Sequence, residues 1–159
     1  MPTLQITSLR LKKMKPGMKP SIYYVIENIG DGEAKNIHIE TRINMVSKKN
    51  NGEVSSILIP SQNSKFFLPK NKTLQKRQDL KQIITASEIK EIEQGDLFLS
   101  AYSLVRYKNE QRKVQRELRT CSVYNPKTKY FEKTFCTCVG EDWPYTGVNQ
   151  PISNNYVNC

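Results

Sequence analysis

Apolar and polar residues alternate along several stretches of the chain, and this alternation predicts strands. The clearest stretch runs from 36 to 45, where one parity is almost entirely apolar: Ile37, Ile39, Thr41, Ile43 and Met45. A period of two is typical of a strand with one buried face. The run 21–27 is apolar on both parities and lies between Pro20 and a turn-rich segment, which predicts a central strand.

The first strand, from 3 to 11, changes phase in its middle. Leu4 and Ile6 share one parity, whereas Leu9 and Leu11 share the other. One extra residue between the two pairs would return all four side chains to a common face. The pattern therefore predicts a β-bulge, or a crossing between two sheets, near residues 7 and 8.

A short helix is predicted after the ambiguous segment 72–84, for which we favour a strand. Thr85 and Glu88 have the spacing of a capping box, in which each side chain accepts a hydrogen bond from the other residue's backbone N–H. Ile89 and Ile92 lie on one side of such a helix, and Gly95 is a typical stop. The expected length is about two turns.

Three further regions complete the predicted sheet. Residues 54–59 form a short strand ended by Pro60, and 97–107 form a long strand that is apolar on both faces. A turn at 108–111 leads into a returning strand at 113–124 that carries many charges, which makes a hairpin. A second turn, at 125–128, leads into 130–139.

Seven or eight short strands with one brief helix, and no alternation of strands with helices, predict an all-β fold. We expect an immunoglobulin-like antiparallel β-sandwich with an irregular, Cys-containing C-terminal tail. Residues 1–138 form the sandwich, and 139–159, which contain no Lys or Arg, form a tail packed on the same domain. The length of 159 residues suits one domain.

The cysteines lie in the last part of the chain, at Cys121, Cys136, Cys138 and Cys159. All four are candidates for disulfides, which would indicate an oxidising compartment. Four cysteines allow three pairings, and the sequence does not choose among them. Free thiols are one alternative. A zinc site is another, but the Cys-Thr-Cys spacing at 136–138 is one residue tighter than the usual knuckle, so no metal site is predicted.

The chain carries 25 Lys and Arg against 15 Asp and Glu, a formal charge of +10. The hairpin 102–119 concentrates this excess beside two tyrosines, and Lys108, Arg112 and Arg116 share one parity, which predicts a positive stripe. Such a ribbon could contact an anionic membrane, a polymer or a nucleic acid, and solubilisation is the alternative. The candidate contact residues are Arg106, Lys108, Arg112, Lys113, Arg116 and Arg119.

No catalytic chemistry is predicted. His38, the single histidine, has the polar parity of its strand, where we expect it to be solvated. The sequence has no Gly-rich phosphate loop, H-E-x-x-H or G-x-S-x-G motif, and it implies no cofactor. Trp143 and Tyr145 in the tail are candidate contacts for a carbohydrate or peptide, because amphipathic rings are typical of recognition surfaces.

The stretch 22–43, IYYVIENIGDGEAKNIHIETRI, resembles the opening of bacterial immunoglobulin-like domains of the cell-adhesion-related (CARDB-like) kind. Those domains have an apolar strand, an Asn-x-Gly turn, a small residue and an Asn before an alternating strand. The corresponding positions here are Asn28, Gly30, Ala34 and Asn36.

The likeness covers about 3–138 and includes a terminal segment with Cys121, Tyr124 and a later Cys, as in uncharacterised bacterial proteins. In those proteins the domain lies outside the cytoplasmic membrane behind one N-terminal anchor helix, and no catalytic residues come with the resemblance. This chain departs from the pattern in its longer tail, 140–159, and the given residues predict neither an anchor helix nor an export signal.

The sequence therefore predicts a non-enzymatic interaction or structural module of a bacterial cell-envelope protein, in the periplasm or on the cell surface. Its partner would be a protein or an envelope polymer, and any membrane anchor would belong to a longer parent protein. The alternative is a cytosolic basic protein that contacts nucleic acid or another polyanion through the hairpin 102–119. In that case the cysteines stay reduced and binding falls steeply with salt.

Overall fold

The computed structural model describes residues 1–48, 52–63, 67–109, 112–133, 138–139 and 143–144. Within these residues one helix, α1 (Ala86–Gln94), follows the fifth strand. The strands are β1 (Leu4–Lys12), β2 (Ser21–Asn28), β3 (Lys35–Ser47), β4 (Gly52–Asn63), β5 (Thr73–Asp79), β6 (Leu97–Asn109), β7 (Val114–Asn125), β8 (Tyr130–Lys133), β9 (Cys138–Val139) and β10 (Trp143–Pro144).

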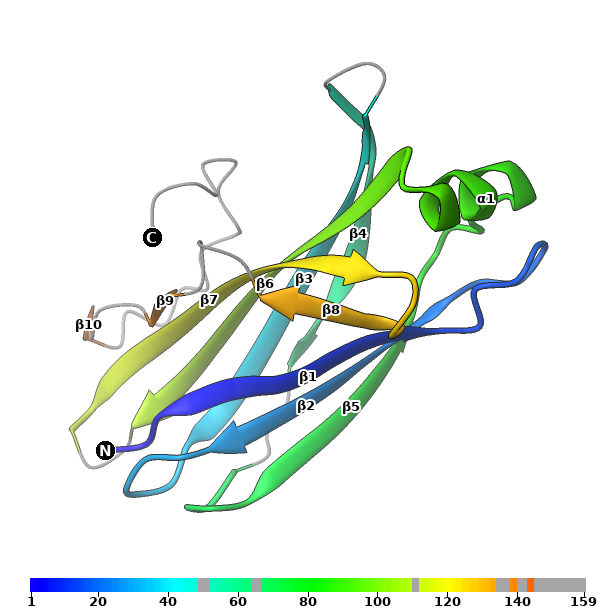
Figure 1. Ribbon diagram of the computed structural model, residues 1–159. Helices are drawn as coiled ribbons and strands as arrows, with labels where there is room; N and C mark the ends of the chain where they lie inside the picture. The colour runs from blue at the N-terminus through cyan, green and yellow to red at the C-terminus, as the bar shows by residue number, and fades with distance from the viewer. Residues whose placement is uncertain (49–51, 64–66, 110–111, 134–137, 140–142, 145–159) are drawn as a thin grey trace.

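The strands pair antiparallel and join into one sheet in the order β4-β3-β6-β7-β8-β1-β2-β5, with β9 and β10 also paired to β7. Figure 1 shows that this sheet is curled: β1, β2 and β5 lie in front of β3, β4 and β6, and β7 and β8 connect the two halves. The predicted class, a mostly antiparallel β fold with one short helix, is confirmed.

The hydrophobic core lies inside the curl and draws on both halves of the sheet. Ile22 of β2 and Ile43 of β3 are fully buried members of the same cluster. Tyr107 of β6 connects the halves directly, because its hydroxyl oxygen accepts the backbone N–H of Leu4 on β1 at 3.3 Å. Strand β6 is buried on both faces over most of its length, as its sequence predicts.

Strand β1 contains the predicted bulge. Its register against β2 shifts between Ile6 and Ser8, which makes Thr7 the extra residue. The shift returns Leu9 to the face that Ile6 occupies, and both side chains are buried. The phase change in the sequence is thus explained by a bulge within one strand.

Helix α1 is held at both ends by the residues that the sequence indicates. Thr85 Oγ1 accepts the N–H of Glu88 at 3.2 Å, and Glu88 Oε1 accepts the N–H of Thr85 at 3.1 Å. Gly95 ends the helix with a φ of 78°, which favours glycine. Ile92 is buried beneath the helix. No helix in the described part of the chain is long and apolar enough to cross a membrane.

Strand β4 runs past Pro60, which was predicted to end it, and continues to Asn63. Pro60 falls where the register against β3 shifts between Ile39 and Thr41, and β4 is an edge strand. A proline is tolerated at such a place because its missing N–H costs no ladder bond. The segment 72–84 is a strand over β5, as favoured.

Candidate functional site

The basic residues of the β6–β7 hairpin lie on both of its faces. Lys108 is opposite Gln115, whereas Arg116 is opposite Tyr107. Residues opposite each other in an antiparallel pair share a face, and here each even-numbered position meets an odd-numbered one. The predicted stripe of Lys108, Arg112 and Arg116 is therefore wrong, because Lys108 and Arg116 project from opposite faces of the hairpin.

Two of the six candidate cations belong to a buried ion cluster, which we define as Arg106, Glu117 and Arg119. Arg106 is 6% exposed, and its Nε donates to Glu117 Oε2 at 3.0 Å. Arg119 Nε donates to Oε1 of the same carboxylate, and Glu117 is 1% exposed. Both oxygens of one buried carboxylate thus accept from arginines of the same hairpin. The Arg106 guanidinium lies inside the fold, whereas the Arg119 side chain is 35% exposed.

The remaining hairpin cations differ in their surroundings. Arg116 Nη1 donates to the backbone oxygen of Pro2 at 3.0 Å and to Thr3 Oγ1 at 3.2 Å, which fastens the N-terminal residues to β7. Arg112 and Lys113, at the turn, are exposed. The hairpin therefore presents its freely exposed charge at its tip rather than along its length.

His38 is buried, contrary to the expectation that it is solvated. It is 7% exposed, lies opposite Arg106, and its Nε2 is 2.7 Å from Glu40 Oε1. The expectation failed because β6, the neighbour of β3, is buried on both faces. Cys121 lies opposite Tyr102, four residues along β6 from Arg106, or about 13 Å at the rise of a strand. His38 and Cys121 therefore form no Cys–His catalytic pair.

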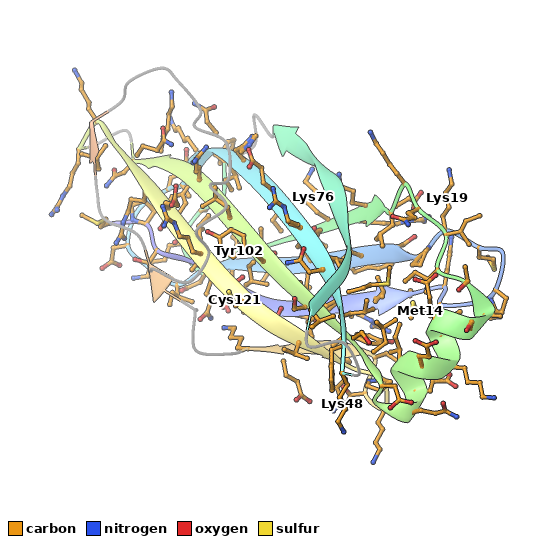
Figure 2. All side chains as sticks on the ribbon, turned by 90° about the horizontal axis from the view of Figure 1, so that it is seen from above. Met14, Lys19, Lys48, Lys76, Tyr102 and Cys121 are labelled. Carbon is orange, nitrogen blue, oxygen red and sulfur yellow. The ribbon has the colours of Figure 1, made fainter. Side chains whose placement is uncertain are left out.

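Cys121 is half-buried on β7, and Figure 2 shows it beside Tyr102, its partner on β6. Ser122 lies opposite Lys133 of β8. The turn into β8 is therefore looser than the tight turn that would place residue 132 opposite Cys121.

The other cysteines follow β8 in the sequence. Cys138 lies on β9 opposite Arg119, two residues along β7 from Cys121. Cys136 and Cys159 lie outside the described residues. The disulfide candidates therefore stay a prediction, with Cys121 and Cys138 placed near each other in register.

The predicted ligand contacts of the tail are placed only in part. Trp143 lies opposite Gln115 on β10, and Tyr145 lies outside the described residues. These pairings attach parts of the segment 139–159 to β7, and the domain boundary at 138 stays a prediction. Among the residues that the structure describes, no group of three or more His, Cys, Asp and Glu side chains could hold a metal ion.

A surface that the sequence analysis missed brings cations and tyrosines together on the outer face of the other half of the sheet. Tyr130, Arg10, Tyr23 and Arg77 are successive partners across β8, β1, β2 and β5. Because opposite residues share a face, the four form one row. We call this row, together with Lys12 beside it, the cation–aromatic ladder.

Each ring of the ladder lies beneath a cation. The Arg10 guanidinium carbon is 5.2 Å from the centroid of the Tyr130 ring. Lys12 Nζ is 4.6 Å, and the Arg77 guanidinium carbon 5.9 Å, from the centroid of the Tyr23 ring. These distances are typical of cation–π contacts, which hold the cations in place without neutralising them. Tyr130 is 40% exposed, so the row is open to a partner.

Asp79 adjoins the ladder at Arg77. Asp79 Oδ1 accepts from the Ser21 hydroxyl and from Arg77, and these two hydrogen bonds hold the pKa of Asp79 below its usual value. Asp79 is therefore ionised at neutral pH and offsets part of the charge of Arg77. The unbalanced positive charge of the ladder rests on Arg10 and Lys12.

A weak signal for the ladder is present in the sequence. Arg10 and Lys12 share the polar parity of β1, and Tyr23 has the same parity in β2 as Ser21 and Glu27. The sequence does not reveal the register that aligns β1, β2, β5 and β8, because Tyr130 of β8 lies 120 positions after its partner Arg10 of β1.

Comparisons with known proteins add no family. No family model matches the chain, and no curated protein matches it. A crystal structure of Spo0M, a sporulation control protein from Bacillus subtilis, is similar with 12% identity and a TM-score of 0.38. The match covers 74% of this chain and 47% of that one, so it spans about half of the Spo0M chain. A likeness this distant carries no argument about function, and the resemblance to CARDB-like domains stays a prediction.

Proposed function

We propose that this chain is a non-enzymatic interaction module of a bacterial cell-envelope protein, with an immunoglobulin-like β-sandwich as its scaffold. The curled sheet supports the sandwich, because its two halves enclose one core and are joined through the hydrogen bond between Tyr107 and Leu4. The outer face of β8, β1, β2 and β5 is then the open face of one layer. The cation–aromatic ladder lies on that face.

The observation that carries the proposal is the contrast between the two sets of cations. Arg106 and Arg119 are committed to the buried carboxylate of Glu117. Arg10 and Lys12, in contrast, lie over exposed or half-exposed rings on an open sheet face. A row of rings and cations suits a linear partner with negative charge and flat apolar surfaces, because arginine binds carboxylates through a fork and rings offer apolar faces. An anionic envelope polysaccharide has that chemistry.

The ladder is tested by comparing two double variants that remove the same charges. Arg10→Gln with Lys12→Gln should weaken binding to polygalacturonate, a carboxylate-bearing polysaccharide, by about tenfold at low salt, because two contacts to the polyanion are lost. Arg112→Gln with Lys113→Gln also removes one Arg and one Lys, from the exposed hairpin tip. We expect a change of less than about threefold there, from net charge alone. Titration calorimetry at several salt concentrations measures both.

The reverse order of effects would move the contact surface to the hairpin, as in the alternative function. Equal losses in the two variants would show that only the formal charge of +10 matters. Tighter binding to single-stranded oligo(dT) than to a polygalacturonate with the same number of negative charges would favour a nucleic acid over a polysaccharide as the partner. Thermal unfolding of both variants checks that neither has lost its fold.

The envelope location predicts a disulfide at Cys121. Cys138 lies opposite Arg119, two residues along β7 from Cys121. A diagonal pair of this kind has α-carbons about 8 Å apart, slightly beyond the limit of about 7 Å that a disulfide spans without backbone movement, and Cys136 precedes Cys138 by two residues in the sequence. We therefore expect Cys121 to be linked to Cys136 or Cys138 in protein exported to a periplasm. Peptide mapping after alkylation under denaturing conditions, without reductant, identifies the link.

Reduction should then lower the free energy of unfolding by about 3 kcal/mol, the value for closing a loop of about 15 residues. Protein made in a reducing cytosol is the control and should carry four alkylated cysteines. Four alkylated cysteines in the exported protein would contradict the disulfide and remove this support for the envelope.

A further inference from the structure

A cavity of about 240 Å³ lies beside the bulge of β1, at the junction of the two halves of the sheet. The cavity lies where the sheet is incomplete. Strand β8 is only four residues long and pairs with β1 at Arg10 and Tyr130, and β1 has its bulge at Thr7. Between the bulge and β7, no described strand fills the space. The lining residues are Ile6, Thr7, Ser8, Leu9, Thr120, Ser122, Tyr130, Phe131 and Lys133.

One wall of the cavity carries a buried hydroxyl without a partner. Ser122 is 5% exposed, and among the described residues its Oγ has no hydrogen-bond partner. Thr120, two positions away on β7, is also buried and lines the same cavity. A buried hydroxyl that makes no hydrogen bond lowers the stability of the fold by about 1 to 3 kcal/mol. A ligand atom in the cavity that bonds to Ser122 Oγ would remove this cost.

The floor of the cavity is apolar and its mouth is positively charged. Ile6, Leu9 and Phe131 are buried core residues. Lys133, which lines the cavity, is exposed, and Tyr130, another lining residue, is the ring over which Arg10 lies in the ladder. Apolar cavities of about 150 Å³ accept a benzene ring, whereas pockets for drug-sized ligands begin at about 300 Å³. The size therefore suits one ring and a small polar group.

We propose that this cavity binds a small carboxylate with an apolar body, such as an aromatic or branched acid. The apolar body lies against Ile6, Leu9 and Phe131. A ligand oxygen accepts the hydrogen bond of the Ser122 hydroxyl, and the negative charge lies toward Lys133 and the ladder. The cavity adjoins the polymer contact at Tyr130, which lines the cavity and also belongs to the ladder.

Benzoate is the probe, and the amide spectrum of ¹⁵N-labelled protein is the readout. We expect saturable shifts at Ser8, Ser122 and Lys133 with a dissociation constant in the millimolar range, as for other ligands of this size. Benzyl alcohol, which is similar in size but uncharged, should bind about tenfold more weakly. In Lys133→Gln, benzoate should fall to the affinity of benzyl alcohol, whereas Lys127→Gln in the exposed turn is a matched control with no effect.

Two results would overturn the proposal. Shifts that rise linearly with benzoate, or that lie away from the cavity, would show that no such site exists. Equal affinities for benzoate and benzyl alcohol in the unmodified protein would remove the carboxylate from the proposal. Ser122→Leu fills the cavity from within and should abolish the shifts. Because Lys133 is exposed, the Lys133→Gln variant keeps the test valid even if Ser122→Leu does not fold.

Discussion

Replacement of Glu117 by alanine is expected to lower the free energy of unfolding by about 3 kcal/mol, or slightly more. The carboxylate is almost completely buried and accepts hydrogen bonds from Arg106 and Arg119. Its removal leaves the buried Arg106 guanidinium without its carboxylate, and breaking one side of a buried ion pair costs about 3 to 5 kcal/mol. Urea unfolding followed by tyrosine fluorescence and circular dichroism measures the change.

Two further variants test whether the loss of stability comes from leaving a buried charge without its partner. Glu33→Ala removes an exposed glutamate whose ion pair with Lys35 spans 3.7 Å, and it should change stability by less than about 0.5 kcal/mol. Arg106→Met combined with Glu117→Leu replaces the buried pair by apolar groups and should recover much of the lost stability. If Glu117→Ala is as stable as Glu33→Ala, the cluster contributes nothing to folding.

The ion cluster could not be predicted from the sequence, for a reason visible in the hairpin. Parity within one strand places Arg106 and Lys108 on one face, but the number of residues in the turn decides which residues of β7 join them. The register pairs Arg106 with Glu117 and Lys108 with Gln115, which changes the expected stripe of cations into an internal ion pair. One residue more or fewer in the turn would have reversed this outcome.

His38 shows a second limit of sequence patterns. Alternation in β3 correctly predicts that Ile37 and Ile39 face the core. It does not predict that the opposite face is exposed to solvent, because a period of two indicates only that the two faces of the strand differ in polarity. The sequence of β6 is apolar on both faces. Because β3 pairs with β6, both faces of β3 should be covered as well, and this argument would have predicted a buried His38.

Local features were predicted well because each is decided by residues that are adjacent in the sequence. The capping box of Thr85 and Glu88, the stop at Gly95 and the bulge at Thr7 are all confirmed. The ladder and the cavity depend instead on pairing between β1 and β8, which are separated by most of the chain. Only long-range register brings those residues together.

Asn28, which ends β2, is a buried polar residue that contacts three separate segments of the chain. It is fully buried, and its Oδ1 accepts the backbone N–H groups of Thr3 at 3.1 Å and Gly30 at 3.2 Å. Its Nδ2 donates to the backbone oxygens of Gly32 and Leu68, both at 2.8 Å. One side chain therefore satisfies backbone groups of the N-terminus, the following turn and the segment before β5.

The turn after Asn28 also explains why glycine stands at position 30. A Cβ atom added to Gly30 would lie 2.3 Å from the backbone oxygen of Met1 and 2.4 Å from the backbone nitrogen of Thr3. Because both atoms belong to the backbone, they cannot move aside at low cost. The Asn-x-Gly turn thus holds the N-terminal residues against β2 through Asn28 and leaves the space for them at Gly30.

Asn28→Ala should lower the free energy of unfolding by about 3 kcal/mol, because it leaves two N–H groups and two carbonyl oxygens of the buried and partly buried backbone without this partner. Each net hydrogen bond contributes about 1 kcal/mol, and each buried group left unpaired costs more. Urea unfolding measures the global loss. Hydrogen exchange at the amides of Thr3 and Gly30 should accelerate beyond that loss, since these two protons bond directly to Asn28 Oδ1.

Asn28→Asp separates the donors from the acceptor, because aspartate keeps an oxygen for Thr3 and Gly30 but cannot donate to Gly32 and Leu68. It should be at least as destabilising as alanine at neutral pH, since it also buries a negative charge, and less destabilising at a pH where the carboxyl group is protonated. Gln75→Ala, on the exposed edge strand β5, is the control and should change stability by less than about 0.5 kcal/mol. If Asn28→Ala leaves exchange at Thr3 and Gly30 unchanged, the Asn28 side chain does not hold the N-terminus, and another contact, such as that of Arg116 with Pro2, carries that role.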